Sequence, residues 1–371
     1  MITAVEVGYF KRFEKQRFEL SDHIVLAGPN NSGKTTLLQA IMVWDLALRR
    51  WRERRAGSTA RDRTGVPLTR KDLTALPLRE MSLLWTDTRT AFRKEDAGPD
   101  QRPSQQRVLT ISLNGRTQDG PWDLTFEFRY QSTELVYIKP SAEQIGNIPK
   151  AAEDLKVVHV PPFSGIGAEE THYDRPYQDL LIGQGKAGDI LRNLLLEVYQ
   201  QQDKSNWSAL CRQTEEIFGC RLLPPEYQGR PYILCEYLPG IPTGKGKNGL
   251  PQLDIASAGS GFHQVLLLLS FFYARPASIL LMDKPDAHLH VILQKQVYDW
   301  LRRVAAERAC QLIVATHSEV LIDDTGPEMI LSFFREPHRL IAPVERDQVT
   351  QALRRLSAMD ILRAEASRVI L

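Results

Sequence analysis

The residues with the most distinctive chemistry are 28–35, GPNNSGKT. They satisfy the pattern G-x-x-x-x-G-K-[S/T], in which the glycines let backbone amides come close to phosphates. Lys34 would reach the β- and γ-phosphates, and Thr35 would offer its hydroxyl to Mg²⁺. The sequence therefore predicts a site for a nucleoside triphosphate such as ATP, together with Mg²⁺. The candidate residues are Gly28, Asn30, Asn31, Ser32, Gly33, Lys34, Thr35 and Thr36.

A carboxylate and a histidine end two apolar stretches later in the chain. SILLMD ends at Asp283, and CQLIVATH ends at His317. A carboxylate at the carboxyl end of a strand can hold the Mg²⁺ that the phosphates share. A histidine at the same edge of the sheet could donate a hydrogen bond to the γ-phosphate. Asp283 is therefore the predicted metal ligand beside Thr35, although either residue could also occupy its strand end for a structural reason.

Residues 256–264, ASAGSGFHQ, place glycines and small polar residues directly before an apolar helix. Exposed amides and a hydroxyl at the start of a helix can bind an anion. The segment has no lysine, so it cannot be a second phosphate loop. It is either a second anion contact or a flexible connector. Its candidate residues are Ser257, Gly259, Ser260 and Gly261.

These residues need strands and helices to position them. Two early strands are predicted by ITAVEVGYF and IVLAG, followed by a helix over TTLLQAIMVWDLALRRW. Further strands are predicted by RVLTISL and WDLTFEFRY, joined by a turn at NGRTQDG, and by ELVYIKP. In the last third, apolar strands alternate with helices, which is typical of a parallel sheet covered on both faces. The predicted fold class is α/β.

Composition limits the kind of protein. The chain has 371 residues, of which 43% are hydrophobic and 25% charged, as in ordinary soluble globular proteins. Its four cysteines form no C-x-x-C pair, which predicts reduced cysteines of a cytoplasmic protein. No apolar run is long enough to span a bilayer, so no membrane role is expected. The net charge is only +2, so DNA contact would need a local patch such as the basic residues 49–71, which could equally be a solvated helix end.

Taken together, the motifs resemble those of an ABC-type ATPase of the RecF and SMC class. GPNNSGKT corresponds to Walker A, SAGSG to the signature motif, LLMD to the Walker B strand and His317 to the switch histidine. The chain is most similar to the ATPase domain of the OLD (overcoming lysogenization defect) family nucleases. The cues are GYFKRF at 8–13, HVPPFSG at 159–165, KAGDILRNLLLEV at 186–198, SAGSGF at 257–262 and PDAHLH at 285–290.

The resemblance implies an ATPase head with a mixed or parallel phosphate-loop sheet, an antiparallel β-subdomain and a helical insertion. We expect this domain over residues 1–346, with an irregular insertion at 57–106 and the helical insertion at 174–230. Residues 347–371 would form a helix and a linker. The resemblance also implies a homodimer or higher oligomer with ATP between two heads. The signature residues of one head would cap the γ-phosphate at Lys34 of the other, and Arg12 stands where an arginine often touches the nucleotide.

The chain departs from the family pattern at two places. In OLD-like nucleases a Toprim-type nuclease domain follows the ATPase, and SRVIL at 367–371 resembles only its lead-in. The nuclease would belong either to a longer chain or to a separate subunit, and this chain alone is not expected to cut DNA. The second departure is Lys284, at the position of the glutamate that polarises the attacking water.

A lysine beside a triphosphate stays protonated, because nearby anions favour its charged form. Lys284 therefore could not accept a proton from water, and losing a general base lowers the rate roughly 10²- to 10⁴-fold. The alternative is that its side chain points into solvent. The sequence predicts an ATP-binding, slowly hydrolysing module, and the resemblance implies that it dimerises and regulates a DNA nuclease in bacterial defence against phage. The rival functions are a non-hydrolysing ATP-gated DNA clamp and a RecF-like repair ATPase.

Overall fold

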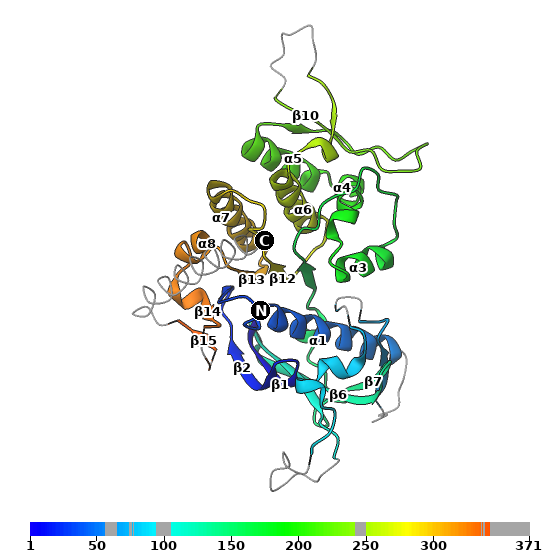
Figure 1. Cartoon of the computed structure of the whole chain (residues 1–371), viewed down its shortest axis with the longest axis vertical. Coiled ribbons are helices and arrows are strands. Elements are labelled where there is room, and N and C mark those ends of the chain that lie inside the picture. The colour runs from blue at the N-terminus through cyan, green and yellow to red at the C-terminus, as the bar shows by residue number, and fades with distance from the viewer. Residues whose placement is uncertain are drawn as a thin grey trace, which may run out of the picture. The chain divides into compact units, whose positions relative to one another are not determined.

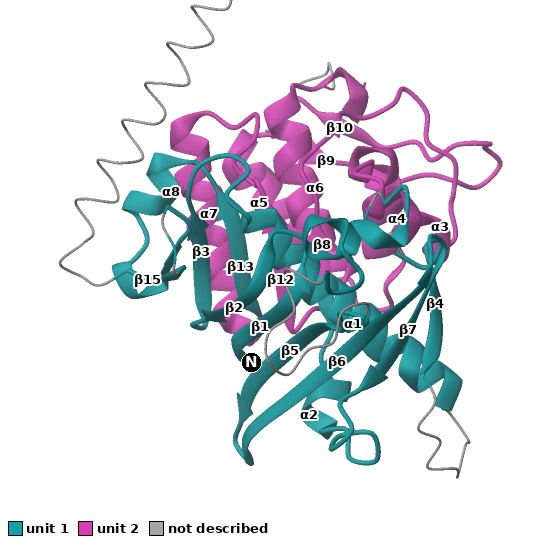
Figure 2. Ribbon diagram, turned by 60° about the horizontal axis from the view of Figure 1, so that its bottom comes forward, with its two compact units in different colours: residues 1–157, 311–371 teal, residues 158–310 magenta. Residues whose placement is uncertain are grey.

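The computed structural model describes residues 1–55, 65–73, 76, 78–93, 105–241, 250–334, 336 and 338–341. The chain forms two compact units, coloured separately in Figure 2. Unit 1 combines Met1–Val157 with Gln311–Leu371, and unit 2 is Val158–Cys310. The expected C-terminal helix and linker at 347–371 lie outside the described residues.

The larger sheet of unit 1 is antiparallel, with the strand order β2-β1-β5-β6-β7-β4. On three of these strands, Val66–Thr69, Gly120–Ser132 and Leu135–Pro140, buried and more exposed residues alternate, as expected for a sheet with one face against the core. The strands are β1 Ile2–Phe10, β2 Phe13–Glu19, β4 Val66–Thr69, β5 Leu109–Thr117, β6 Gly120–Ser132 and β7 Leu135–Pro140.

The second sheet of unit 1 contains the strand that leads into the phosphate loop. Strand β3, His23–Ala27, lies between β13, Gln311–Thr316, and β14, Ile330–Ser332, and is parallel to both. Strand β15, Arg339–Leu340, is antiparallel to β14. Every residue of β13 is buried, as expected for a parallel strand inside a sheet. The unit therefore contains a mixed phosphate-loop sheet.

Helix α1, Lys34–Arg55, packs on the antiparallel sheet (Figure 1). Trp44 is fully buried, and its indole nitrogen donates to the carbonyl of Leu124 at 2.8 Å. The shorter helical elements of unit 1 are α2 Lys150–Glu153, α8 Glu319–Asp323 and the 3-10 turns η1 Met81–Leu84, η2 Thr86–Thr88 and η5 Pro327–Met329.

Unit 2 is built around helix α6, Ser260–Ala274, whose residues from Phe262 onward are all buried. A helix that is apolar on every side must be covered on every side. Helices α4 and α5 pack on α6 (Figure 1). The helical elements are α3 Arg175–Gly183, η3 Ala187–Ile190, α4 Leu191–Gln200, α5 Ser205–Phe218, η4 Ile255–Ser257, α6 and α7 Val291–Glu307.

The strands of unit 2 include a small antiparallel sheet in the order β11-β10-β9. These strands are β9 Arg221–Leu222, β10 Glu236–Leu238 and β11 Leu253–Asp254. Strand β12 is Ile279–Asp283, and β8, Val157–Val160, spans the boundary between the units. The predicted combination of a mixed sheet, an antiparallel β-subdomain and a group of helices is confirmed.

Several local predictions differ from the structure. Strand β2 was not predicted, because FEKQRFE lies at the sheet edge and carries charged residues. NGRTQDG is mostly strand: β5 continues to Thr117 and β6 begins at Gly120, which leaves a two-residue turn. Within 57–106, the described residues include β4, which pairs with β7. Along the described chain, no helix is both long and apolar enough to cross a membrane.

Candidate functional site

The phosphate loop, residues 28–35, joins strand β3 to helix α1. Its backbone takes left-handed angles at Asn31, with φ 59°, and at Gly33, with φ 109°. Gly33 could not carry a side chain, because a Cβ there would lie 2.6 Å from Phe13 Cζ and 2.8 Å from Arg12 Cδ. Both the backbone angle and the close packing therefore explain why this position is a glycine.

Lys34 lies inside the loop, with only 5% of its surface exposed. Its ammonium group donates to the carbonyl oxygens of Gly28 and Pro29, at 2.8 and 2.7 Å, and to Ser32 Oγ at 3.4 Å. The loop thus curls around a positive charge at the amino end of a 22-residue helix. A buried cation and a helix amino terminus at the same place favour an anionic ligand.

The surroundings of the loop come from distant parts of unit 1. The Arg12 guanidinium donates to the carbonyl of Asn31, and Phe333 closes on Gly28, where a Cβ would lie 2.7 Å from Phe333 Cβ. In the sheet, Thr316 of β13 pairs with Ala27 of β3. His317 and the phosphate loop therefore follow adjacent strand ends at one edge of the sheet. The remaining loop candidates, Asn30 and Thr35, are exposed, and Thr36 is half-buried.

In unit 2, Asp283 ends the buried strand β12 and is itself buried, with 7% of its surface exposed. Lys284 follows with φ 53°, a left-handed conformation that is unusual for lysine. The carbonyl of Lys284 accepts a hydrogen bond from Ala287 N at 3.1 Å, which starts a tight turn. Lys284 is half-buried, so it is not simply an exposed solvent-facing residue.

The signature segment, residues 257–261, is largely exposed and leads into α6. A Cβ at Gly259 would meet no atom within 4 Å, whereas one at Gly261 would lie 3.3 Å from the carbonyl oxygen of His288. Gln264 of α6 donates to the carbonyl of Pro285 at 3.2 Å. The signature segment and the turn after Asp283 are thus neighbours within unit 2.

Two of the stretches that resemble the OLD family, 159–165 and 186–198, contact each other next to helix α6. A Cβ at Gly188, in the stretch 186–198, would lie 1.6 Å from the carbonyl oxygen of Gly165, which ends the stretch 159–165. Phe163 of that first stretch packs against the rings of His263 and His288, at 5.9 and 6.1 Å between ring centroids. These cues therefore support the signature region by packing.

The basic stretch 49–71 uses several of its arginines in ion pairs. Arg49 pairs with Asp45 at 2.9 Å, and Arg52 pairs with Glu153 at 3.6 Å. Arg50 pairs with Glu53 and Asp72. Residues 56–64 lie outside the described part of the chain. The described arginines favour a solvated helix surface over a contact with a phosphate backbone.

The candidate residues thus form two sets, one in each unit. Unit 1 brings together Arg12, the phosphate loop and His317, and unit 2 brings together the signature segment, Asp283 and Lys284. Sequence reasoning missed the walls that Phe13 and Phe333 give to the loop. It also missed Arg192, which is bonded to the residues before the signature segment. The available signal was an arginine inside the otherwise apolar stretch DILRNLLLEV.

Comparison with known proteins finds a family model that is similar to part of this site. Residues 240–323 match a family model described as "AAA domain, putative AbiEii toxin, Type IV TA system". This segment includes the signature segment, Asp283, Lys284 and His317. No curated protein matches the chain.

The fold is similar to that of SMC heads of known structure. One is an SMC head bound to the C-winged helix domain of ScpA, with 18% identity, a TM-score of 0.51 and coverage of 90% of this chain and 93% of that one. Another is an Smc head domain with a coiled coil and joint from Pyrococcus yayanosii, with 12% identity, a TM-score of 0.50 and coverage of 95% and 99%. The chain therefore has the fold of an ABC-type ATPase head of the SMC kind.

Proposed function

We propose that this chain is a nucleotide-controlled ATPase head that binds ATP with Mg²⁺, dimerises on it and hydrolyses it slowly. In this proposal the ATP-bound dimer regulates a DNA nuclease, which is a Toprim-type domain or subunit of the OLD kind. A role in bacterial defence against phage follows from the same resemblance. The AAA-type segment at 240–323 and the SMC-head fold support the ATPase part of the proposal.

The observation that carries the proposal is the position of Lys34. A lysine that is 5% exposed and donates to two loop carbonyls and one hydroxyl is arranged to receive an anion in place of those acceptors. The glycines of the loop leave no room for side chains, and a glycine-rich loop before a helix can direct its backbone amides at phosphate oxygens. These residues fit the triphosphate of ATP.

The candidate metal ligands fit Mg²⁺ better than a metal that needs a protein cage. No cluster of three or more histidine, cysteine or acidic side chains suited to a metal occurs among the described residues. Mg²⁺ is usually held by one or two protein groups together with phosphate oxygens and water. Thr35 and Asp283 are the groups that would hold it. The metal would neutralise charge on the phosphates.

Lys284 is the reason to expect slow hydrolysis. It occupies the position directly after Asp283, where the family pattern has a glutamate that would accept a proton from the attacking water. A protonated lysine cannot do so, but it can attract the phosphate charge and favour the ATP-bound state. The same residue favours a second candidate function, an ATP-gated DNA clamp without meaningful turnover.

Nucleotide binding tests the first step. We expect the wild-type chain to bind a fluorescent ATP analogue with Mg²⁺, and Lys34→Ala to weaken this binding at least about 100-fold, because a charge-assisted contact to phosphate is lost. Lys15→Ala is the matched control, since Lys15 is an exposed lysine of strand β2 in the same unit. Equal binding by wild type and Lys34→Ala would refute the proposal.

Steady-state phosphate release separates the two candidate functions. We expect slow turnover in the wild type and an increase of about 10²- to 10⁴-fold in Lys284→Glu, because the variant gains a general base. Lysine and glutamate at position 284 would have the same backbone angle, so the comparison tests the ammonium group against the carboxylate. Turnover that stays absent in both chains would favour the clamp, and fast wild-type turnover that glutamate does not raise would refute the role given to Lys284.

A further inference from the structure

Asp254 shapes the start of the signature segment. Its Oδ1 atom accepts a hydrogen bond from Ala256 N at 2.7 Å, which caps the 3-10 turn η4. Its carbonyl oxygen accepts a bond from Ser257 Oγ, also at 2.7 Å. Asp254 therefore holds both the backbone and the serine hydroxyl from which the segment begins.

Arg192 in turn holds Asp254. Its Nη2 donates to Asp254 Oδ1 at 2.7 Å, and the same guanidinium donates to the carbonyls of Gly167 and Ala168 at 3.0 and 3.1 Å. The Arg192 side chain is 1% exposed, whereas that of Asp254 is 36% exposed. A buried guanidinium with several fixed acceptors has little freedom to move, so it can fix the direction of the Asp254 carboxylate.

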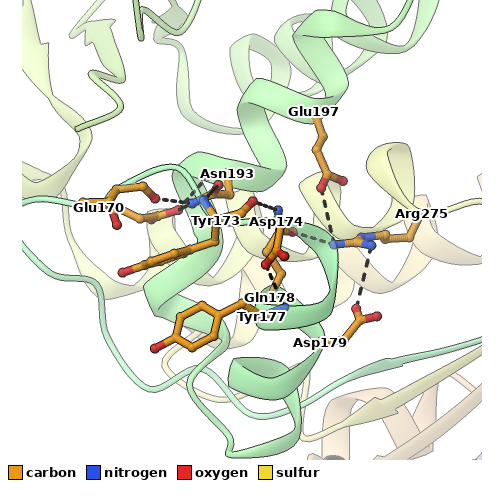
Figure 3. A network of polar contacts seen from close by, with 10 residues as sticks. Glu170, Tyr173, Asp174, Tyr177, Gln178, Asp179, Asn193, Glu197 and Arg275 are labelled. Carbon is orange, nitrogen blue, oxygen red and sulfur yellow. Dashed lines mark hydrogen bonds and ion pairs between the residues drawn. The ribbon is translucent and has the colours of Figure 1, made fainter. Parts of the chain in front are cut away.

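The position of Arg192 is itself fixed from its backbone. Helix α4 has no cap from its own preceding residue, and the buried Glu170 takes that role from a distant segment. One carboxylate oxygen accepts from Arg192 N at 2.9 Å, and the other accepts from Asn193 N and Nδ2, both at 2.6 Å. Figure 3 shows the Glu170 side chain directed at Asn193. A continuous chain of polar contacts thus runs from Glu170 to Ser257.

We infer that Arg192 is a positioning residue that holds the signature segment, through Asp254, in the shape that caps a phosphate. This inference rests on the proposed function of the signature segment. The reason is geometric: Arg192 lies at the start of α4, and its guanidinium bonds Asp254 just before the segment and the carbonyls of Gly167 and Ala168, rather than residues 257–261. Its effect would therefore pass through Asp254.

The opposite end of helix α6 offers a matched control. Arg275, which ends α6, is also buried, with 3% of its side chain exposed. It donates to Gln178 Oε1 at 2.6 Å and to Glu197 Oε1 at 3.5 Å, as Figure 3 shows. Arg192 connects helix α4 to Asp254, just before α6, and Arg275 connects the end of α6 to helix α3. Arg275 lies at the opposite end of the 15-residue helix α6 from the signature segment. Arg192→Lys and Arg275→Lys make the same chemical change at the two ends.

Amide hydrogen exchange without nucleotide tests the positioning directly. We expect the amides of residues 255–261 to exchange about tenfold faster in Arg192→Lys, because one ammonium cannot replace the three fixed contacts of the guanidinium. Arg192→Met should increase exchange further, and Arg275→Lys should leave these amides unchanged. Unchanged exchange in Arg192→Lys and Arg192→Met would overturn the inference, as would an equal effect of Arg275→Lys.

Dimerisation then connects this positioning to function. Sedimentation velocity with ATP and Mg²⁺ should show that the wild type forms a dimer. The affinity of Arg192→Lys for its own dimer should be at least about tenfold lower. Binding of the fluorescent ATP analogue to single chains should stay within about twofold of wild type. Normal dimerisation of Arg192→Lys would overturn the inference. A wild type that binds no ATP would refute the proposed function instead, and hydrogen exchange would still decide the role of Arg192.

Discussion

The phosphate loop and the signature segment both stand before a helix, yet they differ in how they are enclosed. In the phosphate loop, Lys34 is buried, and a Cβ at Gly33 would overlap Phe13. In the signature segment, Gly259 is exposed and faces open space. The first is a cradle that one unit completes by itself. The second is an open surface that does not enclose a ligand by itself, so a bound ligand would need further contacts from elsewhere.

This difference shows that similar residue types need different support. The phosphate loop is held by its walls, Phe13, Phe333 and Arg12, which contact the glycines and the Asn31 carbonyl. The signature segment has no such walls at Gly259, and it is held through the residues on either side of it, by Asp254 before it and Gln264 after it. A surface of this kind suits the proposed dimer, because it leaves the glycine amides accessible to a second chain.

The largest expected effect comes from adding one methyl group to each segment. We expect Gly33→Ala to lower ATP affinity about 100-fold or more, because alanine is strained at φ 109° and its Cβ would overlap Phe13. Gly259→Ala, at φ −75° in open space, should change neither the affinity of single chains for ATP nor stability by more than about 0.5 kcal/mol. Isothermal titration with ATP and thermal denaturation measure both. Similar losses in the two variants would mean that the segments are not enclosed differently.

A smaller effect is expected at the wall of the phosphate loop. Arg12→Ala removes the donor to the Asn31 carbonyl and should weaken ATP binding about tenfold, because the loop loses a contact that fixes its shape. Arg17→Ala serves as the control, since Arg17 is an arginine of strand β2 in the same unit that pairs with Glu6 and Glu19. The same titration gives the answer, and an Arg12→Ala chain with unchanged affinity would show that the loop keeps its shape without this wall.

The smallest effect is a pH dependence behind the signature segment. Burial raises the pKa of Glu170 from about 4.5 to about 7, against the opposing hydrogen bonds from Arg192 and Asn193. Arg192 also acts on this carboxyl by its charge, and Cys235 lies near both. The folded chain binds this proton more tightly than the unfolded chain. Its contribution to stability is therefore complete below about pH 4.5, declines as the pH rises and is lost above about pH 7.

Thermal denaturation between pH 4.5 and 8 measures this contribution, and we expect a decline of a few degrees. Unit 1 contains a comparable group, Asp45, whose pKa burial raises from 3.8 to about 6 despite Arg49. Glu170→Gln should therefore remove the part of the decline that continues up to about pH 7, and Asp45→Asn only a part that ends at about pH 6. A decline from pH 6 to 7 that survives in Glu170→Gln would assign it to another group.

Much of the fold could be predicted because its strands and helices carry strong local patterns. The phosphate loop follows an apolar strand and opens a long helix, and the pattern of GPNNSGKT was sufficient to find it. Strand β2 could not be found in this way, because FEKQRFE alternates weakly and pairs only along one edge. Alternation of apolar and polar residues along a strand indicates that one face of the strand is buried. An edge strand that carries many charged residues shows little of this alternation.

The support of the site was harder to predict than its chemistry. Arg192 and Asp254 are 62 positions apart, and Asp254 alone looks like an ordinary cap for a turn. Phe333 meets Gly28 across most of the chain. Such contacts depend on the tertiary fold, which a single sequence does not encode in any short motif. That the loop and the predicted metal ligand Asp283 bind the same ATP stays a prediction, because they belong to different units.

The order of strands around the phosphate loop has a consequence for how the chain is made. Both hydrogen-bonded neighbours of β3, namely β13 and β14, come from residues beyond 310. A ribosome must therefore synthesise all of unit 2 before β3 can find either partner. At about 5–20 residues per second, unit 2 alone occupies roughly eight to thirty seconds. During that time the strand that leads into the loop waits unpaired, so the inserted unit can fold first and the nucleotide cradle is completed last.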